Sequence, residues 1–267
     1  MKAIFKKLLL LTTVVFTAAS VQFAQPDKIK ELPGKKFVGE SANYEARFSK
    51  FISFSVAELV ITTSLAPNGS DLIIKGDAVS KGTLIKIARF SFVQNYVSTV
   101  DLNGFKILKT VKHDEQKERV RDSEAIFDYG QKQVTYVETD PKNPNRPPSR
   151  IASDIDEPMN DISSSIFALR LLPFAVGKRF EIPVSDSGVV YRIPVPVTAR
   201  ELVKTAIGKV WCWRVEPEVF GNGRLVEQKG KLVIWVTDDD RRIPVKARID
   251  ASIGKVEIKI KDYKKTP

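Results

Sequence analysis

The stretch Ile234–Ile249 reads IWVTDDDRRIPVKARI and places three aspartates and two arginines between two apolar runs. Aspartate side chains accept hydrogen bonds from the backbone of a turn, and the two arginines neutralise the acids. A calcium loop fits less well, because it needs oxygen ligands at alternate positions and a glycine, and the next alternate position after Asp240 holds an arginine. The stretch therefore predicts a β-hairpin in which Asp238, Asp239 and Arg241 have structural roles and bind no metal.

Apolar and polar residues alternate with a period of two in both directions from this hairpin, as half-buried strands require. Tyr44–Phe48 and Tyr191–Val197 are two such runs, and clusters of Asn, Asp and Gly separate the runs into hairpins. Pro194 and Pro196 share one parity, and their missing N–H groups favour an edge strand. The pattern predicts a mainly β protein, built as two consecutive curved antiparallel sheets or as one large open barrel.

Residues 140–150 read DPKNPNRPPSR and interrupt this pattern. Proline lacks the N–H group that a ladder needs, so four prolines in one stretch predict a surface loop. We expect a proline-rich connection over residues 141–159. It would divide the mature chain into a first β-rich half at residues 39–140 and a second half at residues 160–267.

The strongest helical signal, NDISSSIFALRLL, lies at Asn160–Leu172, directly after that connection. Asp161 or its neighbour Asn160 can cap the free N–H groups of the first turn, and Arg170 suits the negative end of the helix dipole. This helix is expected either to form a lid over a cavity or to plug one end of a curved sheet. A weaker helical pattern covers Thr83–Val93.

The N-terminus carries three lysines, then the uncharged run Leu8–Ala19, then small residues. A basic start, a short apolar run and small residues at a cleavage site are typical of a secretory signal peptide. The run is shorter than the ~20 apolar residues that span a bilayer. We expect residues 1–20 to be a signal peptide, cleaved between Ser20 and Ala24, and residues 21–38 to be flexible. The mature protein would then be periplasmic or secreted and would not span a membrane.

The formal net charge is +11, and loss of the three N-terminal lysines would lower it to +8. For an exported protein, nucleic acid is not the expected partner of such a charge. Anionic lipid head groups, lipopolysaccharide and acidic glycans are more natural partners. Lysines scattered along strands also have a simpler explanation, since they keep sheet edges from pairing with other chains.

One cysteine, Cys212, and one histidine, His113, leave too few ligands for most transition-metal sites. Cys212 lies in the alternating run VWCWRV, which predicts a buried side chain, and His113 lies in a polar segment that predicts a hairpin tip. No phosphate-binding loop, dinucleotide fingerprint or zinc-ligand spacing is present. The sequence therefore predicts no cofactor, and it assigns no catalytic residue.

Aromatic side chains are the remaining candidates for binding. Trp211, Trp213, Trp235 and Phe167 could line a lipophilic site at the mouth of a curved sheet, although most aromatic residues of the chain are expected in the core. An enzyme would instead need two carboxylates that face one another across a cleft, at least one of them with a raised pKa. Acids such as Glu216 or Asp239 would serve in that case.

Two motifs, taken in order, resemble a known family. They are Asp161-x-x-Ser164-x-x-Phe167-x-Leu169-Arg170 with Gly177, and Trp235-x-x-Asp238-Asp239-x-Arg241-x-Ile243-Pro244-Val245. With the early Gly39-Glu40 and Tyr44-Glu45, they are similar to the bacterial envelope family called domain of unknown function 3108, as far as Ile260. The resemblance implies an exported or periplasmic protein with an antiparallel β fold and no established activity. By looser analogy, such sheets resemble the half-barrels with a helical lid of lipoprotein carriers.

These observations favour a non-enzymatic exported envelope protein that binds a lipid or an envelope glycan and serves in its transport or assembly. One alternative is a carboxylate-dependent hydrolase that acts on envelope polymers. Another is a scaffold that binds a second envelope protein through an exposed sheet edge. A cavity would support ligand binding, facing acids would support the hydrolase, and an apolar patch without a pocket would support the scaffold.

Overall fold

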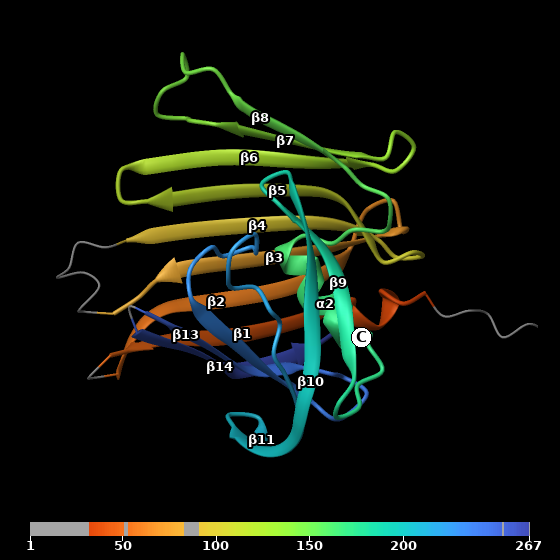
Figure 1. Cartoon of the computed structure of the whole chain (residues 1–267), viewed down its shortest axis with the longest axis vertical. Coiled ribbons are helices and arrows are strands. Elements are labelled where there is room, and N and C mark those ends of the chain that lie inside the picture. Colours follow the sequence, from red (N-terminus) through yellow and green to blue (C-terminus); the bar gives the residue numbers. More distant parts are fainter. Residues whose placement is uncertain (1–31, 51–52, 83–90, 253, 267) are drawn as a thin grey trace, which may run out of the picture. The chain divides into compact units, whose positions relative to one another are not determined.

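A computed structural model describes residues 32–50, 53–82, 91–252 and 254–266. These residues form one antiparallel sheet of fourteen strands, in the order β8-β7-β6-β5-β4-β3-β2-β1-β14-β13-β12-β11-β10-β9 (Figure 1). Within β1–β8 and within β9–β14, strands that follow one another in the chain are neighbours, and β1 pairs with β14 to join the two parts. The prediction of a mainly antiparallel β protein is confirmed, and the sheet is single and not closed into a barrel.

The strands are between 6 and 17 residues long. Strands β1 to β8 span Glu40–Ser49, Ser53–Leu65, Asp71–Ser80, Phe92–Asp101, Lys106–Gln116, Arg119–Asp128, Gln133–Thr139 and Ser149–Asp154. Strands β9 to β14 span Arg179–Asp186, Val189–Thr205, Gly208–Val215, Gly230–Thr237, Pro244–Ala251 and Gly254–Lys265. A 3-10 helix, η1 (Lys35–Phe37), precedes β1, and helix α2 (Ile162–Arg170) lies between β8 and β9.

The sheet curls so that the β9–β10 hairpin approaches β7 and β8 (Figure 1). The turn of this hairpin contains Gly188, where an added Cβ would lie 2.7 Å from the Cβ of Tyr136 and 3.0 Å from that of Ile151. Gly188 also has a φ of +79°, which L side chains rarely adopt. The close approach of the two ends therefore depends on a glycine at this turn.

Helix α2 lies inside the curl and contacts β9 on one side and β3 and β4 on the other. Phe167 belongs to a core cluster with Phe37 and Leu72, whereas Leu169 belongs to a second cluster with residues of β9 and β10 such as Val184. Because both apolar sides of the helix are buried, α2 is a plug of the curled sheet. The predicted helix at Asn160–Leu172 is confirmed, with Asp161 as its N-cap.

Edge strand β9 is covered at its middle by a short parallel bridge. The segment before α2 pairs with it in parallel: the N–H of Asn160 donates to Pro183 O at 3.1 Å, and the N–H of Ser185 donates to Asn160 O at 2.8 Å. This pairing satisfies backbone groups that would otherwise be available for aggregation.

Two local predictions were wrong. The proline-rich connection over residues 141–159 contains a strand, β8, which begins at Ser149 directly after Pro148 and pairs with β7. His113 lies within β5, because the tip of that hairpin is at residues 117–118. Of the weaker helical pattern at Thr83–Val93, residues 83–90 lie outside the described part, and β4 begins at Phe92.

The prolines of β10 do not mark a sheet edge, since β10 is the strand next to β9. The carbonyl oxygens of Pro194 and Pro196 accept hydrogen bonds from the N–H groups of Glu218 and Glu216, at 2.9 and 3.0 Å. The N and O atoms of one residue point to the same side of an antiparallel strand. The missing N–H groups therefore point away from β9, and the ladder between β9 and β10 keeps its donors.

Candidate functional site

A buried ion pair joins the start of β1 to the end of α2. The guanidinium of Arg170 donates to both carboxylate oxygens of Glu40, at 2.6 and 2.8 Å, and the two side chains are only 4% and 7% exposed. Its carbon Cζ lies 4.4 Å from the ring centroid of Phe37 and 5.0 Å from that of Phe167. A third hydrogen bond, of 2.7 Å, reaches the carbonyl oxygen of Arg241. Arg170 thus holds η1, β1, α2 and the β12–β13 turn together.

That β12–β13 turn is held by its own aspartates. Asp239 accepts hydrogen bonds from the backbone N–H groups of Arg241 and Arg242 and from the hydroxyl of Thr237. Asp238 accepts the indole N–H of Trp213 at 2.7 Å and pairs with Arg200. Asp239 is thus engaged by donors of the turn and its flank, and Asp238 by donors of β10 and β11. Within the described residues, no group of three or more His, Cys, Asp or Glu side chains could hold a metal ion.

Asp161 is almost fully buried beneath the sheet, at the other end of α2. Its Oδ1 accepts the N–H of Ser164 at 2.7 Å, and Ser164 Oγ in turn accepts the N–H of Asp161, which completes a capping box. Its Oδ2 accepts the hydroxyls of Ser98 and Thr110, at 2.5 and 2.6 Å. The cap therefore also fixes the helix to β4 and β5.

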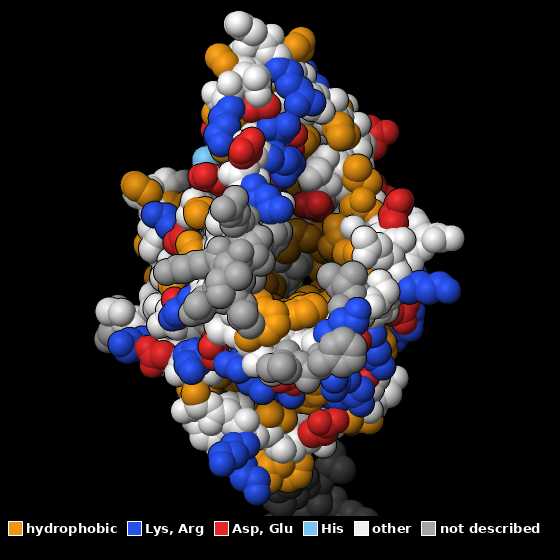
Figure 2. All heavy atoms as spheres, turned by 90° about the vertical axis from the view of Figure 1, so that its left-hand side faces the viewer, with side chains coloured by type: hydrophobic (Ala, Val, Ile, Leu, Met, Phe, Trp, Pro, Cys, Tyr) orange, Lys and Arg blue, Asp and Glu red, His pale blue; other side chains and the backbone are white. Residues whose placement is uncertain are grey.

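Beyond the N-terminus of α2, the concave face of the sheet lines a hollow. Figure 2 shows it from the end of the sheet where β5 meets β6, with hydrophobic side chains within and charged side chains around it. One row of paired residues crosses this face: Ile61, Gly76, Tyr96, Lys112, Ser123 and Glu138. A Cβ at Gly76 would lie 3.9 Å from Ser163 Oγ, so this row faces the first turn of α2.

The hollow is apolar on one side and polar on the other. Strands β2 and β3 contribute Leu59, Ile61 and the small residues Gly76 and Ala78, all of them half-buried. Strands β4 to β7 contribute polar and charged side chains at the positions that pair, strand by strand, with these residues. A long apolar group and a polar or charged group could therefore be held at opposite sides of one cavity.

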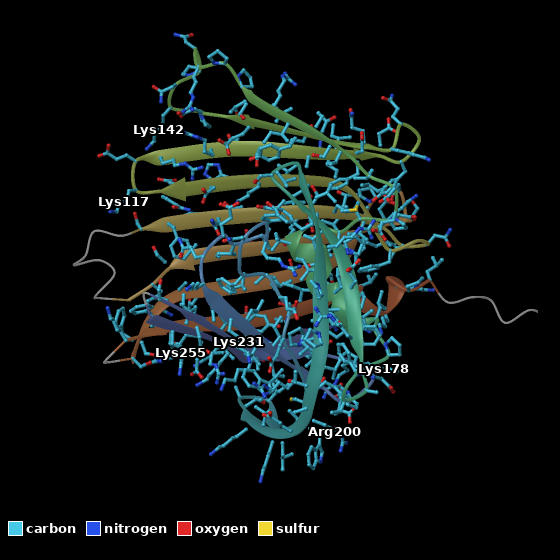
Figure 3. All side chains as sticks on the ribbon, in the orientation of Figure 1. Lys117, Lys142, Lys178, Arg200, Lys231 and Lys255 are labelled. Carbon is cyan, nitrogen blue, oxygen red and sulfur yellow. The ribbon has the colours of Figure 1, made fainter. Side chains whose placement is uncertain are left out.

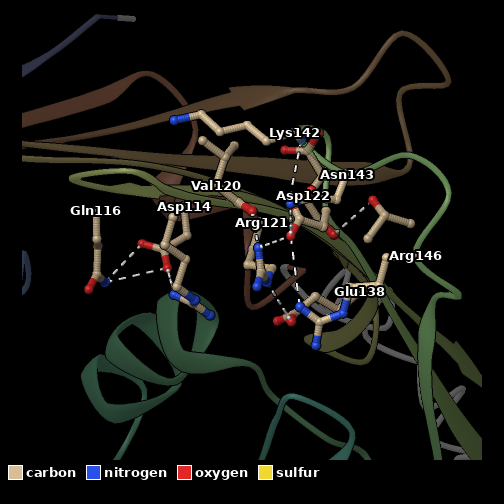
Figure 4. A network of polar contacts seen from close by, with 12 residues as sticks. Asp114, Gln116, Val120, Arg121, Asp122, Glu138, Lys142, Asn143 and Arg146 are labelled. Atoms are coloured by element: carbon tan, nitrogen blue, oxygen red, sulfur yellow. Dashed lines mark hydrogen bonds and ion pairs between the residues drawn. The ribbon is translucent and has the colours of Figure 1, made fainter.

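Most charges on the polar side are paired (Figure 4). Buried Asp114 accepts hydrogen bonds from Gln94, Gln116 and Arg119, at 2.8, 3.1 and 2.7 Å. Burial alone would raise the pKa of Asp114, but the two amides and the nearby Lys112 and Arg119 outweigh it and hold the pKa below its usual value. This carboxylate is therefore ionised and fully engaged.

A second group on the polar side centres on Arg121, which pairs with Asp140 at 2.8 Å and with Glu138 at 3.3 Å (Figure 4). Arg121, Asp140 and the loop after β7 line an open recess of about 600 Å³ together with Glu118, Arg119, Lys142, Asn143 and Arg146. Figure 3 places Lys117 and Lys142 at this same end of the sheet. The end at which the hollow opens is therefore rich in cations.

Lys112 differs from Arg119 and Arg121, because no carboxylate lies within 4 Å of it among the described residues. Its Nζ lies 5.9 Å from the ring centroid of Tyr96. Lys112 also lines a small cavity of about 20 Å³, with Thr110, Ser123, Tyr136 and residues 185–187 of the β9–β10 turn. That volume is enough for about one water molecule. A half-buried lysine without a carboxylate within 4 Å can contact an anionic ligand.

A separate groove of about 620 Å³ lies between the far part of β10 and strands β12, β13, β14 and β1. Its lining includes Trp235, Val245 and Ile260, with four lysines, at residues 204, 246, 259 and 261. Three of these lysines are paired with acids: Lys246 and Lys259 with Glu257 at 3.1 and 2.8 Å, and Lys261 with Glu45 at 3.7 Å. Most of the positive charge of the groove is thus neutralised by acids of the same strands.

Glu257 makes the stability of this region depend on pH. Replacing Glu257 with glutamine is expected to lower the free energy of unfolding near pH 7. The hydrogen bond from Lys259, with Lys246 beside it, holds the pKa of Glu257 at about 2, below its ordinary 4.5. A carboxylate with a lowered folded pKa stabilises the fold above its unfolded pKa and loses that effect as the pH falls through the folded value. Urea unfolding at a series of pH values would therefore show the difference between wild type and Glu257→Gln shrinking between pH 4.5 and 2.

Glu58→Gln is the matched control, since it removes a carboxylate whose pair with Lys81 is exposed on both sides. Exposed pairs contribute little, so this variant should remain close to wild type. A constant difference for Glu257→Gln down to the lowest pH would show that the carboxylate charge is not what stabilises the groove.

The four aromatic residues expected to bind a ligand lie in different environments. Phe167 is buried in the first core cluster, Trp235 is buried against β13, Trp213 packs against Phe174, and Trp211 is 48% exposed. Only Trp235 lines a described pocket, the groove beneath β10. The structure therefore does not bring the four together. Trp211 and Trp213 share one face of β11, Trp235 of β12 points to the other face, and Phe167 lies on α2.

The two acids considered for a hydrolase are both held ionised. Burial would raise the pKa of Glu216, but hydrogen bonds from Lys231 and Thr198 and the charge of Arg214 lower it below its usual value. Burial would also raise the pKa of Asp239, but hydrogen bonds from Arg241 and Thr237 outweigh it, and the pKa of Asp239 lies below its usual value. A general acid needs the opposite shift, so neither residue has the environment that the hydrolase hypothesis requires.

The sequence-based reasoning missed Lys112 and its surroundings. The polar segment around His113 suggested a solvent-exposed hairpin tip, whereas alternate residues of that segment face the hollow. One signal was available: Lys112, Asp114 and Gln116 continue the parity of Thr110 along β5. Because alternate residues of a strand face the same side, three polar residues in step with buried Thr110 indicate that this side of β5 forms a polar wall of the interior.

The fold is similar to that of a solved beta-barrel-like protein. A beta-barrel-like protein of domain of unknown function DUF1849 from Brucella abortus has a TM-score of 0.56 at 11% identity, with 86% of this chain and 99% of that chain covered. The sequence matches "Protein of unknown function (DUF3108)" over residues 43–261, and the chain belongs to this family. The resemblance found in its motifs is thereby confirmed.

Two further solved structures are more distant. A candidate lipoprotein from Parabacteroides distasonis has a TM-score of 0.32 at 8% identity, with 86% of this chain and 96% of that chain covered. A candidate exported protein with a YmcC-like fold from Bacteroides fragilis has a TM-score of 0.30 at 10% identity, with 85% and 96% covered. The comparison with curated proteins gave no match. In the described part of the chain, no helix has the length and apolar character needed to cross a bilayer.

Proposed function

We propose that this protein is a non-enzymatic, exported envelope protein whose hollow binds a lipid with an anionic head group and serves in its transport or assembly. One observation carries the proposal: Lys112, without a carboxylate partner, faces the hollow on its polar side, opposite an apolar side made by β2 and β3. The basic N-terminal segment followed by an apolar run supports export to the periplasm or beyond it.

The apolar side favours an acyl chain. Leu59 and Ile61 are half-buried on the same face of the sheet as Gly76, and they pack against the core clusters beside the hollow. Small residues at Gly76 and Ala78 leave room above β3. Covering such surface with a hydrocarbon chain is favourable, by about 25 cal/mol for each Å² of apolar surface removed from water.

The polar side favours an anionic head group over a neutral glycan. Lys112 is half-buried and has no ion pair within 4 Å among the described residues, although the charge of Asp114 lies nearby. A phosphate or carboxylate in direct contact with its ammonium group would therefore be stabilising. The hydroxyl of Ser123 lies next to it in the row and could donate to the same group. A neutral glycan would leave the lysine unpaired and would place hydroxyl groups against Leu59 and Ile61.

The test is native mass spectrometry of the mature protein from its own periplasm, followed by organic extraction of any bound mass. Wild type is expected to carry a stoichiometric lipid, and Lys112→Glu is expected to lose it. Lys75→Glu is the matched control, because Lys75 is an exposed lysine of β3 on the face opposite to Gly76. In parallel, titration with a fluorescent phosphatidylglycerol should show affinity weakened about tenfold or more by Lys112→Glu alone.

Two outcomes would contradict the proposal. One is equal lipid content and equal affinity in wild type and Lys112→Glu. The other is a wild-type protein that carries no lipid and does not bind the fluorescent lipid in titration.

A further inference from the structure

The far half of the β10–β11 hairpin presents an apolar pair to solvent at the lower end of the sheet in Figures 1 and 3. Leu202 and Trp211 are cross-strand partners in this hairpin, and they are 43% and 48% exposed. Residues on alternate positions of the same strands face the other way. There Cys212 is fully buried, and Val203 and Val210 pack against the third core cluster with Trp235 and Ile243.

The buried face anchors the hairpin, so the exposed pair is not needed for packing. Burial raises the pKa of the Cys212 thiol to about 12, in keeping with a dry contact beneath the strand. A strand with one face in the core normally carries polar residues on its other face. A tryptophan and a leucine paired on the solvent side depart from that pattern and indicate an interaction surface.

Cations frame the pair on its exposed face. The guanidinium of Arg200 lies 4.5 Å from the ring centroid of Trp211. Lys204 and Lys209 are direct cross-strand partners, and neither has a carboxylate within 4 Å among the described residues. Like charges placed opposite one another destabilise a hairpin unless an anionic partner is present. Asp238, which pairs with Arg200 of this face, is also engaged by the indole N–H of Trp213.

We propose that this face, made by Arg200, Leu202, Lys204, Lys209 and Trp211, docks the protein onto the surface of an anionic phospholipid bilayer. Tryptophan is enriched at the boundary between head groups and acyl chains, where its ring is apolar and its N–H remains wet. Lysine and arginine side chains beside it reach the anionic head groups. Two apolar side chains are too few for the core of a stable protein–protein interface, which favours a membrane surface as the partner.

This docking face is separate from the hollow, and its proposal does not require that the hollow binds lipid. The test is co-sedimentation of the full mature chain with vesicles of phosphatidylcholine alone or with about a third phosphatidylglycerol. Wild type is expected to bind the anionic vesicles, to release them at high salt, and to show a blue shift of tryptophan fluorescence on binding.

Two double variants test the two parts of the surface. Leu202→Ser with Trp211→Ala removes the apolar pair, and Lys204→Glu with Lys209→Glu reverses the charge; each is expected to lower vesicle binding tenfold or more. The controls are Ile126→Ser, which removes an apolar side chain 50% exposed on β6, and Lys75→Glu with Lys229→Glu, which makes the same change of net charge.

Equal binding of the variants and their controls, or no binding of wild type to anionic vesicles, would overturn the docking proposal. The lipid extracted from the hollow is measured on the same variants. Unchanged lipid content with lost vesicle binding would separate failure of docking from failure of the proposed function. Thermal unfolding of each variant verifies that the fold is kept.

Discussion

Replacing Arg170 with alanine is expected to lower the free energy of unfolding by ~3–5 kcal/mol, because it leaves Glu40 as a buried carboxylate without its partner. The guanidinium also donates to the carbonyl oxygen of Arg241 and stacks on Phe37 and Phe167. Its removal would therefore loosen η1, the start of β1, the end of α2 and the β12–β13 turn together. Urea unfolding monitored by circular dichroism measures the loss.

The chain provides a matched control in Arg179, which binds Glu218 through the same two-bond geometry, at 2.8 and 2.8 Å. That pair is 55% and 38% exposed, so Arg179→Ala is expected to cost under about 1 kcal/mol. A double variant, Arg170→Met with Glu40→Leu, should recover much of the lost stability, because it removes both buried charges. If Arg170→Ala were no more harmful than Arg179→Ala, the ion pair would not be what joins these elements.

The sequence could predict only those contacts of Arg170 and its surroundings that join residues close together in the chain. Asp161 as a cap, the end of the helix near Arg170, and the turn formed by Asp238, Asp239 and Arg241 each depend on residues a few positions apart. Their signals are capping and turn preferences, which need no knowledge of the fold. Glu40, in contrast, lies 130 residues from Arg170. No local pattern could pair them.

The register of strand pairing fixes the environments that the sequence could not predict. The run VWCWRV correctly predicts that Cys212 lies opposite in parity to its two tryptophans, and Cys212 is buried. It does not reveal that Trp213 would meet Asp238 and Phe174 while Trp211 would meet solvent, because this depends on where β12 ends beside β11. The same holds for Lys112, whose environment is set by pairing with β4 and β6. The strand β8 was missed for a simpler reason, since four prolines directly before Ser149 obscured its start.

Asp161 provides the second large expected effect. Asp161→Ala should destabilise the fold by ~3 kcal/mol, because it removes the helix cap and leaves the hydroxyls of Ser98 and Thr110 and the N–H of Ser164 buried without an acceptor. Asp128 is the matched control: it also accepts two backbone N–H groups, from Gly130 and Gln131, but in an exposed turn. Asp128→Ala should therefore cost ~1 kcal/mol or less.

An isosteric variant separates the hydrogen bonds of Asp161 from its shape. Asp161→Asn keeps one carbonyl oxygen for Ser164 but turns an N–H₂ group toward Ser98 and Thr110, so an intermediate loss is expected. Because Thr110 lies two residues before Lys112 on β5, freeing it should also disturb the polar wall of the hollow. Hydrogen exchange should then show faster exchange in α2 and at Lys112 in Asp161→Asn, at a denaturant concentration where the variant remains folded. Unchanged exchange at Lys112 would mean that the cap fixes the helix alone, and that the wall is held by Asp114 and its amide partners.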